Sequence, residues 1–202
     1  MRFILSILSL SLINLIFGQQ GLFPYQVYGP NDYNGSSQNW AAAQDSKGRM
    51  YFANTGVLLK FNGTDWEQIN IGNTSLTTAV DIDKNDNIYV GGYKELGQLL
   101  PTRSGKLKFK SFLNDSLRST INRIWKIKIS PDSGVYFIAN EGVFRYYEDS
   151  LYVIRPDSNR FVSLCEVEGR IFTNGPQGLH EIKGHQIDAT RNGTNFKNLP
   201  VW

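Results

Sequence analysis

The stretch GRMYFANTGVLLKFNGTDW, residues 48–66, contains two short apolar segments separated by turn sequences. Thr55-Gly56 lies between MYFAN and VLLKF, and Asn62-Gly63 follows the second segment. Asn-Gly favours a tight hairpin because both residues tolerate a positive φ angle. The stretch therefore predicts the middle strands of a small antiparallel sheet, with a further strand beginning near Trp66.

The same arrangement occurs four times along the chain. Each unit has a short strand, in turn NWAAAQD, TTAVDID, RIWKIKIS and FVSLCEVE. A strand with an aromatic residue follows, at Tyr51, Tyr89, Tyr136 and Phe172. A turn ending in glycine comes next, at Gly56, Gly97, Gly142 and Gly178, which are 41, 45 and 36 residues apart. Four-stranded units with a period of roughly 40 to 50 residues predict a β-propeller.

The repeats define the expected fold class and domains. We expect an all-β chain, a β-propeller of four-stranded blades, with about four blades in residues 36–187. The blade boundaries are expected at about 36–72, 73–113, 118–156 and 157–187. A β-sandwich is the first alternative, although it does not repeat similar turns at a fixed interval. A parallel β-solenoid is the second, although its coils are usually shorter.

The N-terminus has the pattern of a secretory signal peptide. Arg2 precedes an apolar run from Phe3 to Phe17, and Gly18 offers a small residue at a cleavage point. An uncleaved membrane anchor is the alternative, although the run is shorter than the ~20 apolar residues of a spanning helix. We therefore expect residues 1–18 to be a signal peptide, residues 19–35 to be a lead-in, and the mature chain to be exported. Cys165 cannot form an intrachain disulfide because it is the only cysteine, and its apolar strand predicts a core position.

The sequence AAAQDSKGRMYFANTGVLLKFNGTDWEQI, residues 41–69, resembles the two-component-regulator propeller repeat. That repeat has an Asp-x-x-Gly turn, a strand that begins with an aromatic residue, a turn with glycine, a leucine-containing strand and an Asn/Asp-Gly turn. The resemblance covers residues 36–187, and the second and fourth copies depart from it at GGYKELGQL and NGPQGL.

The resemblance implies the exported sensor region of a bacterial hybrid histidine kinase or a related triple-tyrosine-motif regulator. In that family the propellers precede an immunoglobulin-like domain, a membrane helix and a cytoplasmic output domain. Because the family uses more than four blades, we expect an N-terminal part of a larger propeller, with residues 188–202 starting a further blade. The implied partners are the remaining blades and signalling domains.

Composition and motifs exclude several functions. A formal charge of +3 with scattered Lys and Arg gives no basic stripe for a nucleic acid. His180 and His185 lack the companions of a metal site. DIDKNDN, residues 81–87, lacks the glycine and glutamate positions of a calcium loop and predicts a turn. We therefore expect no catalytic residues, no metal, no cofactor and no enzyme activity in this region.

A binding face is the favoured site hypothesis. In a propeller, the loops that enter each first strand share one face with the turns between the second and third strands. Aromatic, amide and carboxylate groups together suit an oligosaccharide or another small extracytoplasmic ligand. An exported glycan lyase or hydrolase and a structural or protein-interaction propeller are the alternatives. The face would carry Trp40, Asn54, Tyr93, Glu95, Arg123, Trp125, Asn140, Glu141, Asn174 and Gln177.

Overall fold

The computed structural model describes residues 25–72, 74–132, 134–155, 163–175 and 177–197. The predicted signal peptide, the first residues of the lead-in and residues 198–202 lie outside this part. The first eight strands are β1 (Asn39–Gln44), β2 (Met50–Asn54), β3 (Val57–Phe61), β4 (Trp66–Ile69), β5 (Thr77–Ile82), β6 (Ile88–Gly92), β7 (Glu95–Pro101) and β8 (Leu107–Ser111). The other eight are β9 (Ile124–Ile129), β10 (Val135–Ala139), β11 (Gly142–Tyr147), β12 (Ser150–Ile154), β13 (Ser163–Val167), β14 (Arg170–Gly175), β15 (Gly178–Lys183) and β16 (Gln186–Ala189). The helices are α2 (Pro30–Tyr33), α3 (Asp115–Thr120) and the 3-10 helix η1 (Gly193–Phe196).

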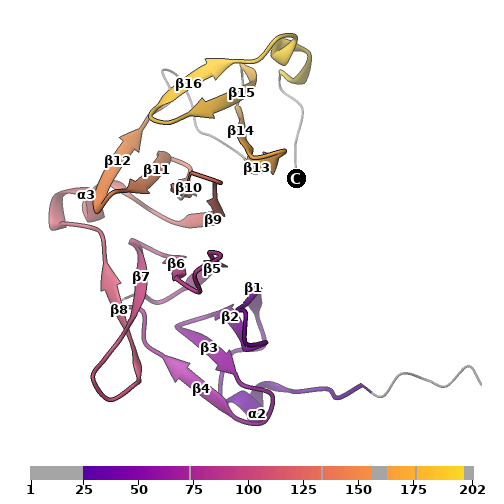
Figure 1. Ribbon diagram of the computed structural model, residues 1–202, viewed down its shortest axis with the longest axis vertical. Coiled ribbons are helices and arrows are strands. Elements are labelled where there is room, and N and C mark those ends of the chain that lie inside the picture. The colour runs from indigo at the N-terminus through magenta and orange to yellow at the C-terminus, as the bar shows by residue number, and fades with distance from the viewer. Residues whose placement is uncertain (1–24, 73, 133, 156–162, 176, 198–202) are drawn as a thin grey trace, which may run out of the picture.

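The strands form four antiparallel sheets of four consecutive strands each, which we call blades one to four. Figure 1 shows the blades side by side in an arc, with β1, β5, β9 and β13 on its concave side. These inner strands also neighbour one another from blade to blade. The predicted all-β chain of four-stranded blades is thus confirmed.

The core consists of three layers, one between each pair of adjacent blades. Side chains alternate between the two faces of a strand, so each blade packs one face on the blade before it and the other on the blade after it. Tyr51, Tyr89 and Tyr136, the repeated aromatic residues, are buried in the layers that their blades share with the next blade. Phe172, in the same position of blade four, is only half-buried on the face turned away from blade three.

The turns between the first and second strands explain two motifs. The Asp45 carboxylate accepts hydrogen bonds from the backbone N–H groups of Lys47 and Arg49 at 3.0 and 2.9 Å. Asp83 accepts the equivalent two bonds in blade two, each at 2.9 Å. Gly48, with a φ angle of 78°, ends the first of these turns as predicted. The turn interpretation of residues 81–87 is confirmed as well.

The glycine repeat was assigned wrongly in blade two. The turn between β6 and β7 consists of Tyr93 and Lys94, and Lys94 has the positive φ angle, 53°. Gly97 instead lies inside β7, where a Cβ atom would come within 2.1 Å of the Lys110 carbonyl oxygen. This glycine therefore permits close packing of β8 rather than a turn.

The lead-in covers part of the outer face of blade one. Phe61 and Trp66 lie on the face turned away from blade two, because Leu58 and Ile69 occupy the opposite face. Tyr33 of α2 packs on Trp66 with a centroid distance of 5.2 Å. Other ring pairs in this cluster are Phe61 with Trp66 at 4.6 Å and Tyr28 with Phe61 at 5.0 Å. The lead-in thus takes the role that a neighbouring blade has elsewhere in the arc.

Replacing Trp66 tests this cap. We expect Trp66→Ala to lower the free energy of unfolding by about 3 kcal/mol, since a large half-buried aromatic side chain leaves the cluster. Urea denaturation followed by circular dichroism measures the change. Tyr25→Ala is the control, because Tyr25 belongs to the same lead-in but is 82% exposed. Equal stability of the two variants would contradict the capping role.

A bidentate ion pair on blade four predicts a pH effect. Arg170 donates to both carboxylate oxygens of Glu181, at 2.7 and 2.6 Å, and these bonds lower the pKa of Glu181 from 4.5 to about 2. A carboxyl group whose pKa is lower in the folded than in the unfolded state stabilises the fold at pH values above its unfolded-state pKa. This stabilisation is lost as the pH falls through the folded-state pKa. The stability difference between the wild type and Arg170→Gln should therefore shrink between pH 6 and pH 2. Urea denaturation across this range measures it, with Arg191→Gln as an exposed control; a constant difference would refute the assignment.

Candidate functional site

Three of the inner strands carry a β-bulge at the same position. In blade one the register passes from Asn39↔Asn54 to Ala41↔Ala53, which leaves Trp40 unpaired. Corresponding shifts leave Thr78 unpaired in β5 and Trp125 in β9. A bulge redirects the side chain of the extra residue. The bulges therefore leave Trp40, Thr78 and Trp125, near the start of their inner strands, without a partner residue on the second strand.

The bulge residues differ in exposure. Thr78 is buried, and its hydroxyl donates to the backbone carbonyl of Ile124, which ties blade two to blade three. Trp40 and Trp125 each leave 44% of their surface exposed. At this position blade two thus has a side chain that hydrogen-bonds to the next blade, whereas blades one and three each have an indole ring that is partly exposed to solvent.

Arg123 connects the two indole rings. A bridge between Tyr93 and Arg123, together with a hydrogen bond from the Lys94 N–H to the Asn122 carbonyl at 2.7 Å, fixes the chain just before β9. The guanidinium carbon of Arg123 lies 4.6 Å from the ring centroid of Trp125 and 5.9 Å from that of Trp40. Both distances are within the range of cation–π contacts.

Asn140 fixes the orientation of one indole. The Trp125 Nε1–H group donates to the Asn140 side-chain oxygen at 3.1 Å. Five predicted site residues therefore come together from three blades. We call them the rim cluster: Trp40, Tyr93, Arg123, Trp125 and Asn140.

Two other predicted site residues are buried and hold neighbouring segments. Asn54 accepts from the Ser36 N–H at 2.9 Å and donates to the Ser36 carbonyl at 2.7 Å, which attaches the segment just after the lead-in to β2. Glu95 is 2% exposed and accepts hydrogen bonds from Arg118 and Ser111. Arg118 belongs to α3, so this ion pair fixes the segment between blades two and three.

The remaining three predicted residues lie on blades three and four. Glu141 is in the turn between β10 and β11, and its Oε2 atom is shielded from solvent without a hydrogen-bond partner in the described part of the chain. Asn174 is buried in β14, whereas Gln177 is exposed in the turn before β15. Glu141 is the residue after Asn140 of the rim cluster, whereas Asn174 and Gln177 belong to blade four, which contributes no residue to that cluster.

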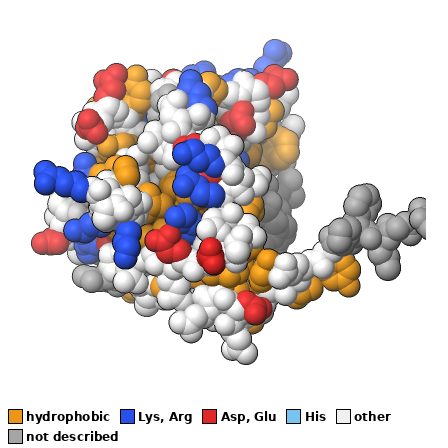
Figure 2. Space-filling view, turned by 60° about the horizontal axis from the view of Figure 1, so that its bottom comes forward, with side chains coloured by type: hydrophobic (Ala, Val, Ile, Leu, Met, Phe, Trp, Pro, Cys, Tyr) orange, Lys and Arg blue, Asp and Glu red, His pale blue; other side chains and the backbone are white. Residues whose placement is uncertain are grey.

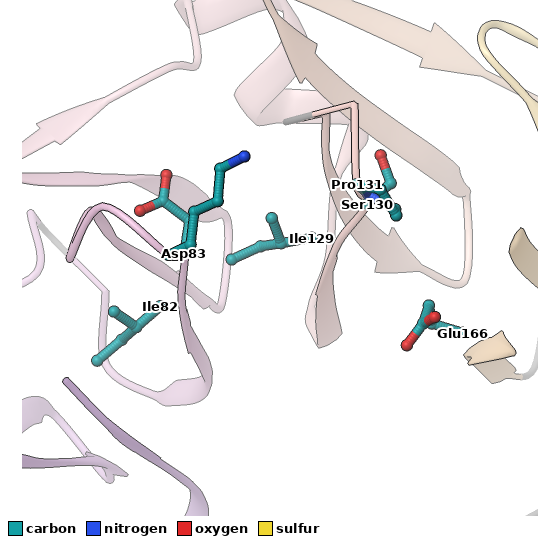
Figure 3. A pocket seen from close by; sticks show the side chains of 7 residues that line it. Ile82, Asp83, Ile129, Ser130, Pro131 and Glu166 are labelled. Atoms are coloured by element: carbon teal, nitrogen blue, oxygen red, sulfur yellow. The ribbon is translucent and has the colours of Figure 1, made fainter. Parts of the chain in front are cut away.

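A cavity lies at the opposite ends of the inner strands, and sequence reasoning did not find it. Figure 3 shows its lining, and its volume is about 420 Å³. Several of its polar groups already have partners within the chain: Asp83 and Ser130 bond within their own turns, and Glu166 accepts from the Gly169 N–H at 2.6 Å. The sequence feature that could have pointed to this cavity is the set of turns between the first and second strands, which contribute several of its lining residues. The cavity is lined by Ile82, Asp83, Lys84, Ile129, Ser130, Pro131 and Glu166.

Charge is mixed over the surface. Figure 2 shows Lys and Arg groups interspersed with Asp and Glu on the face that it draws, in keeping with the net charge of +3. Within the described ranges, no group of three or more His, Cys, Asp or Glu residues could hold a metal ion. Cys165 is exposed, so its predicted core position is wrong: it lies on the face of blade four turned away from blade three.

The fold is shared with solved structures. The extracellular domain of a protein described as a hybrid two-component system from B. thetaiotaomicron superposes with a TM-score of 0.62 at 15% identity, covering 81% of this chain and 24% of that one. Virginiamycin B lyase from Staphylococcus aureus gives 0.60 at 11% identity, covering 80% and 57%. The WD40 β-propeller domain of Doa1 gives 0.51 at 11% identity, covering 71% and 50%. These likenesses establish the β-propeller fold.

The comparisons set limits as well. Neither a protein-family model nor a curated protein sequence matches the chain. The chain spans little more than half of the lyase and about a quarter of the two-component domain. Among the described residues no helix is long and apolar enough to cross a membrane.

The prediction that this chain is not an enzyme has to be corrected. Virginiamycin B lyase, an enzyme by name, has the same fold over 80% of this chain. The sequence motifs that we looked for and did not find, such as a pair of metal ligands on one helix, belong to enzymes of other folds. Their absence does not exclude catalysis by a propeller. At 11% identity the lyase does not establish an activity here either, so the fold leaves enzyme status open.

The Glu95–Arg118 pair allows a test of which predicted residues are structural. We expect Glu95→Gln to lower the free energy of unfolding by about 2 kcal/mol, because the half-buried Arg118 then loses its carboxylate partner. Glu67→Gln is the matched control: Glu67 pairs with Lys60 near the surface, and its loss should cost less than about 0.5 kcal/mol. Urea denaturation of both variants measures the difference, and similar losses would argue against a structural role of Glu95.

Proposed function

We propose that the chain is the ligand-binding propeller of an exported signalling receptor, and that the rim cluster binds its ligand. The observation that carries the proposal is the pair of cation–π contacts that Arg123 makes with the exposed indole rings of Trp40 and Trp125. Exposed aromatic rings held in a fixed orientation are suited to stacking against a sugar ring or another flat ligand. An oligosaccharide is the proposed ligand class.

Two further observations support the receptor role. The repeat resembles the two-component-regulator propeller repeat, and the fold is similar to the extracellular domain of a hybrid two-component system. In this proposal residues 1–18 act as a cleaved signal peptide, the chain is periplasmic or extracellular, and further blades and signalling domains are its partners. Ligand binding at the rim would then be transmitted through blade contacts to those domains.

Binding by the purified chain tests the proposal. A panel of neutral and acidic oligosaccharides is titrated into the chain while tryptophan fluorescence and heat are recorded. We expect at least one saccharide to bind, and Trp125→Ala to weaken it about 10- to 30-fold, corresponding to ~1.4–2 kcal/mol. Trp40→Ala should weaken the same saccharide as well.

Tyr152→Ala serves as the control, because Tyr152 is an exposed aromatic residue that stacks on His185 away from the rim cluster. It should leave the affinity unchanged. Unchanged binding in both tryptophan variants would disprove the assignment of the site. Formation of cleaved products from a bound saccharide would identify the chain as a glycan lyase or hydrolase instead of a receptor propeller.

A further inference from the structure

Arg123 differs from every other arginine in the described part of the chain. Four arginines make ion pairs with carboxylates, and three others are exposed. Arg123 is half-buried, yet it makes no ion pair with any described residue. The ion-paired arginines are Arg49, Arg118, Arg145 and Arg170, and the exposed ones are Arg103, Arg155 and Arg191.

The guanidinium group of Arg123 contacts aromatic rings but makes no hydrogen bond or ion pair with a described residue. A guanidinium group contacts aromatic rings through its flat faces, whereas its N–H groups point outward in the plane. Trp40 and Trp125 therefore hold the group in place without using its donors. Such a fixed, planar fork is suited to binding a carboxylate through two parallel hydrogen bonds.

The surrounding charge favours an anion. Lys126, the residue after Trp125, is exposed, and the Lys94 ammonium lies over the Tyr93 ring at 5.5 Å from its centroid. Neither lysine makes an ion pair with a described residue. Two acidic residues are close in sequence, but Glu95 already binds Arg118, and the Oε2 atom of Glu141 is shielded from solvent. Apart from the half-buried Glu141, the charged groups around the rim cluster that make no ion pair with a described residue are thus cations.

The indole rings and the Arg123 guanidinium together indicate which class of ligand fits the rim cluster. A neutral sugar would use the indole rings and leave the Arg123 donors unpaired, which carries a desolvation cost. An isolated carboxylate would use Arg123 and leave the exposed indole surface in water. We propose that the rim cluster recognises an acidic saccharide, a sugar unit with a carboxylate that Arg123 binds and a ring face that stacks on Trp40 or Trp125. This inference rests on the function proposed above and specifies its ligand.

Matched saccharides test the inference. Oligomers of galacturonate, glucuronate, mannuronate and guluronate are each compared with their own methyl esters, which keep the ring but lose the charge. Calorimetric titration of the full chain should show at least one acid that binds tenfold or more tightly than its ester. Acetate at the same carboxylate concentration should not displace that oligomer, because it lacks the ring.

Variants separate the roles of the charge and the rings. Arg123→Gln should bind the acid and its ester with equal affinity, and Arg123→Lys should lose at least threefold, since a lysine keeps the charge but not the planar fork. Trp40→Ala should weaken both the acid and its ester, because the sugar ring that they share loses its stacking surface. Arg103→Gln, which removes an exposed cation from the turn between β7 and β8, is the control and should behave like the wild type. Thermal melting confirms that each variant is folded.

The outcomes distinguish this inference from the proposed function. If neutral oligosaccharides bind at the rim tryptophans and no acid exceeds its ester, the ligand class is wrong and the receptor proposal stands. If an acid is preferred but Arg123→Gln keeps the full preference, the role of Arg123 is wrong. If no saccharide binds at all, both proposals fail.

Discussion

Face-to-face packing between adjacent blades is the constraint on which the rest of this structure depends. A four-stranded sheet cannot bury both faces by itself, so each blade needs a neighbour on either side. Tyr51, Tyr89 and Tyr136 meet this need in successive layers, each fully or nearly fully buried against the next blade. Where blade one has no preceding blade among the described residues, Tyr28 and Tyr33 of the lead-in cover part of its outer face. The same requirement thus explains the repeated aromatic residues and the packing of the N-terminal segment.

The rim cluster is a consequence of this packing. Inner strands lie beside one another only when the blades are stacked, and this brings β1, β5 and β9 into sequence-distant contact. The residue at the bulge has one of two roles: Thr78 joins two blades, whereas Trp40 and Trp125 are partly exposed to solvent. Because Arg123 reaches rings from blades one and three, the site requires the relative placement of three blades and does not exist in any one of them.

The sequence revealed the fold more readily than the site. The period of about 40 residues and the turns at Asp45 and Asp83 are local signals, so the strands and their order could be predicted from them. Burial depends on which face meets a neighbour, and for this reason the roles of Asn54 and Glu95 were not visible in a turn pattern. Gly97 was misplaced because a glycine in a strand and a glycine in a turn look alike in sequence. The cavity at Ile82 and Ile129 depends on the distance between neighbouring blades, and this distance cannot be predicted from the sequence of a single repeat.

Stability alone does not account for the rim cluster. Large aromatic side chains stabilise a fold when they are buried, as Tyr51 and Phe137 are, with 0% exposure. Trp40 and Trp125 leave 44% of their surface in water, and each lies at a bulge that interrupts the ladder between the first and second strands. The hydrogen bond to Asn140 and the contact with Arg123 restrict the orientation of the Trp125 ring, which would lower the entropic cost of binding the proposed ligand. Exposed rings at positions where the sheet ladder is interrupted add little to the stability of the fold, and this is why we propose a ligand-binding role for them.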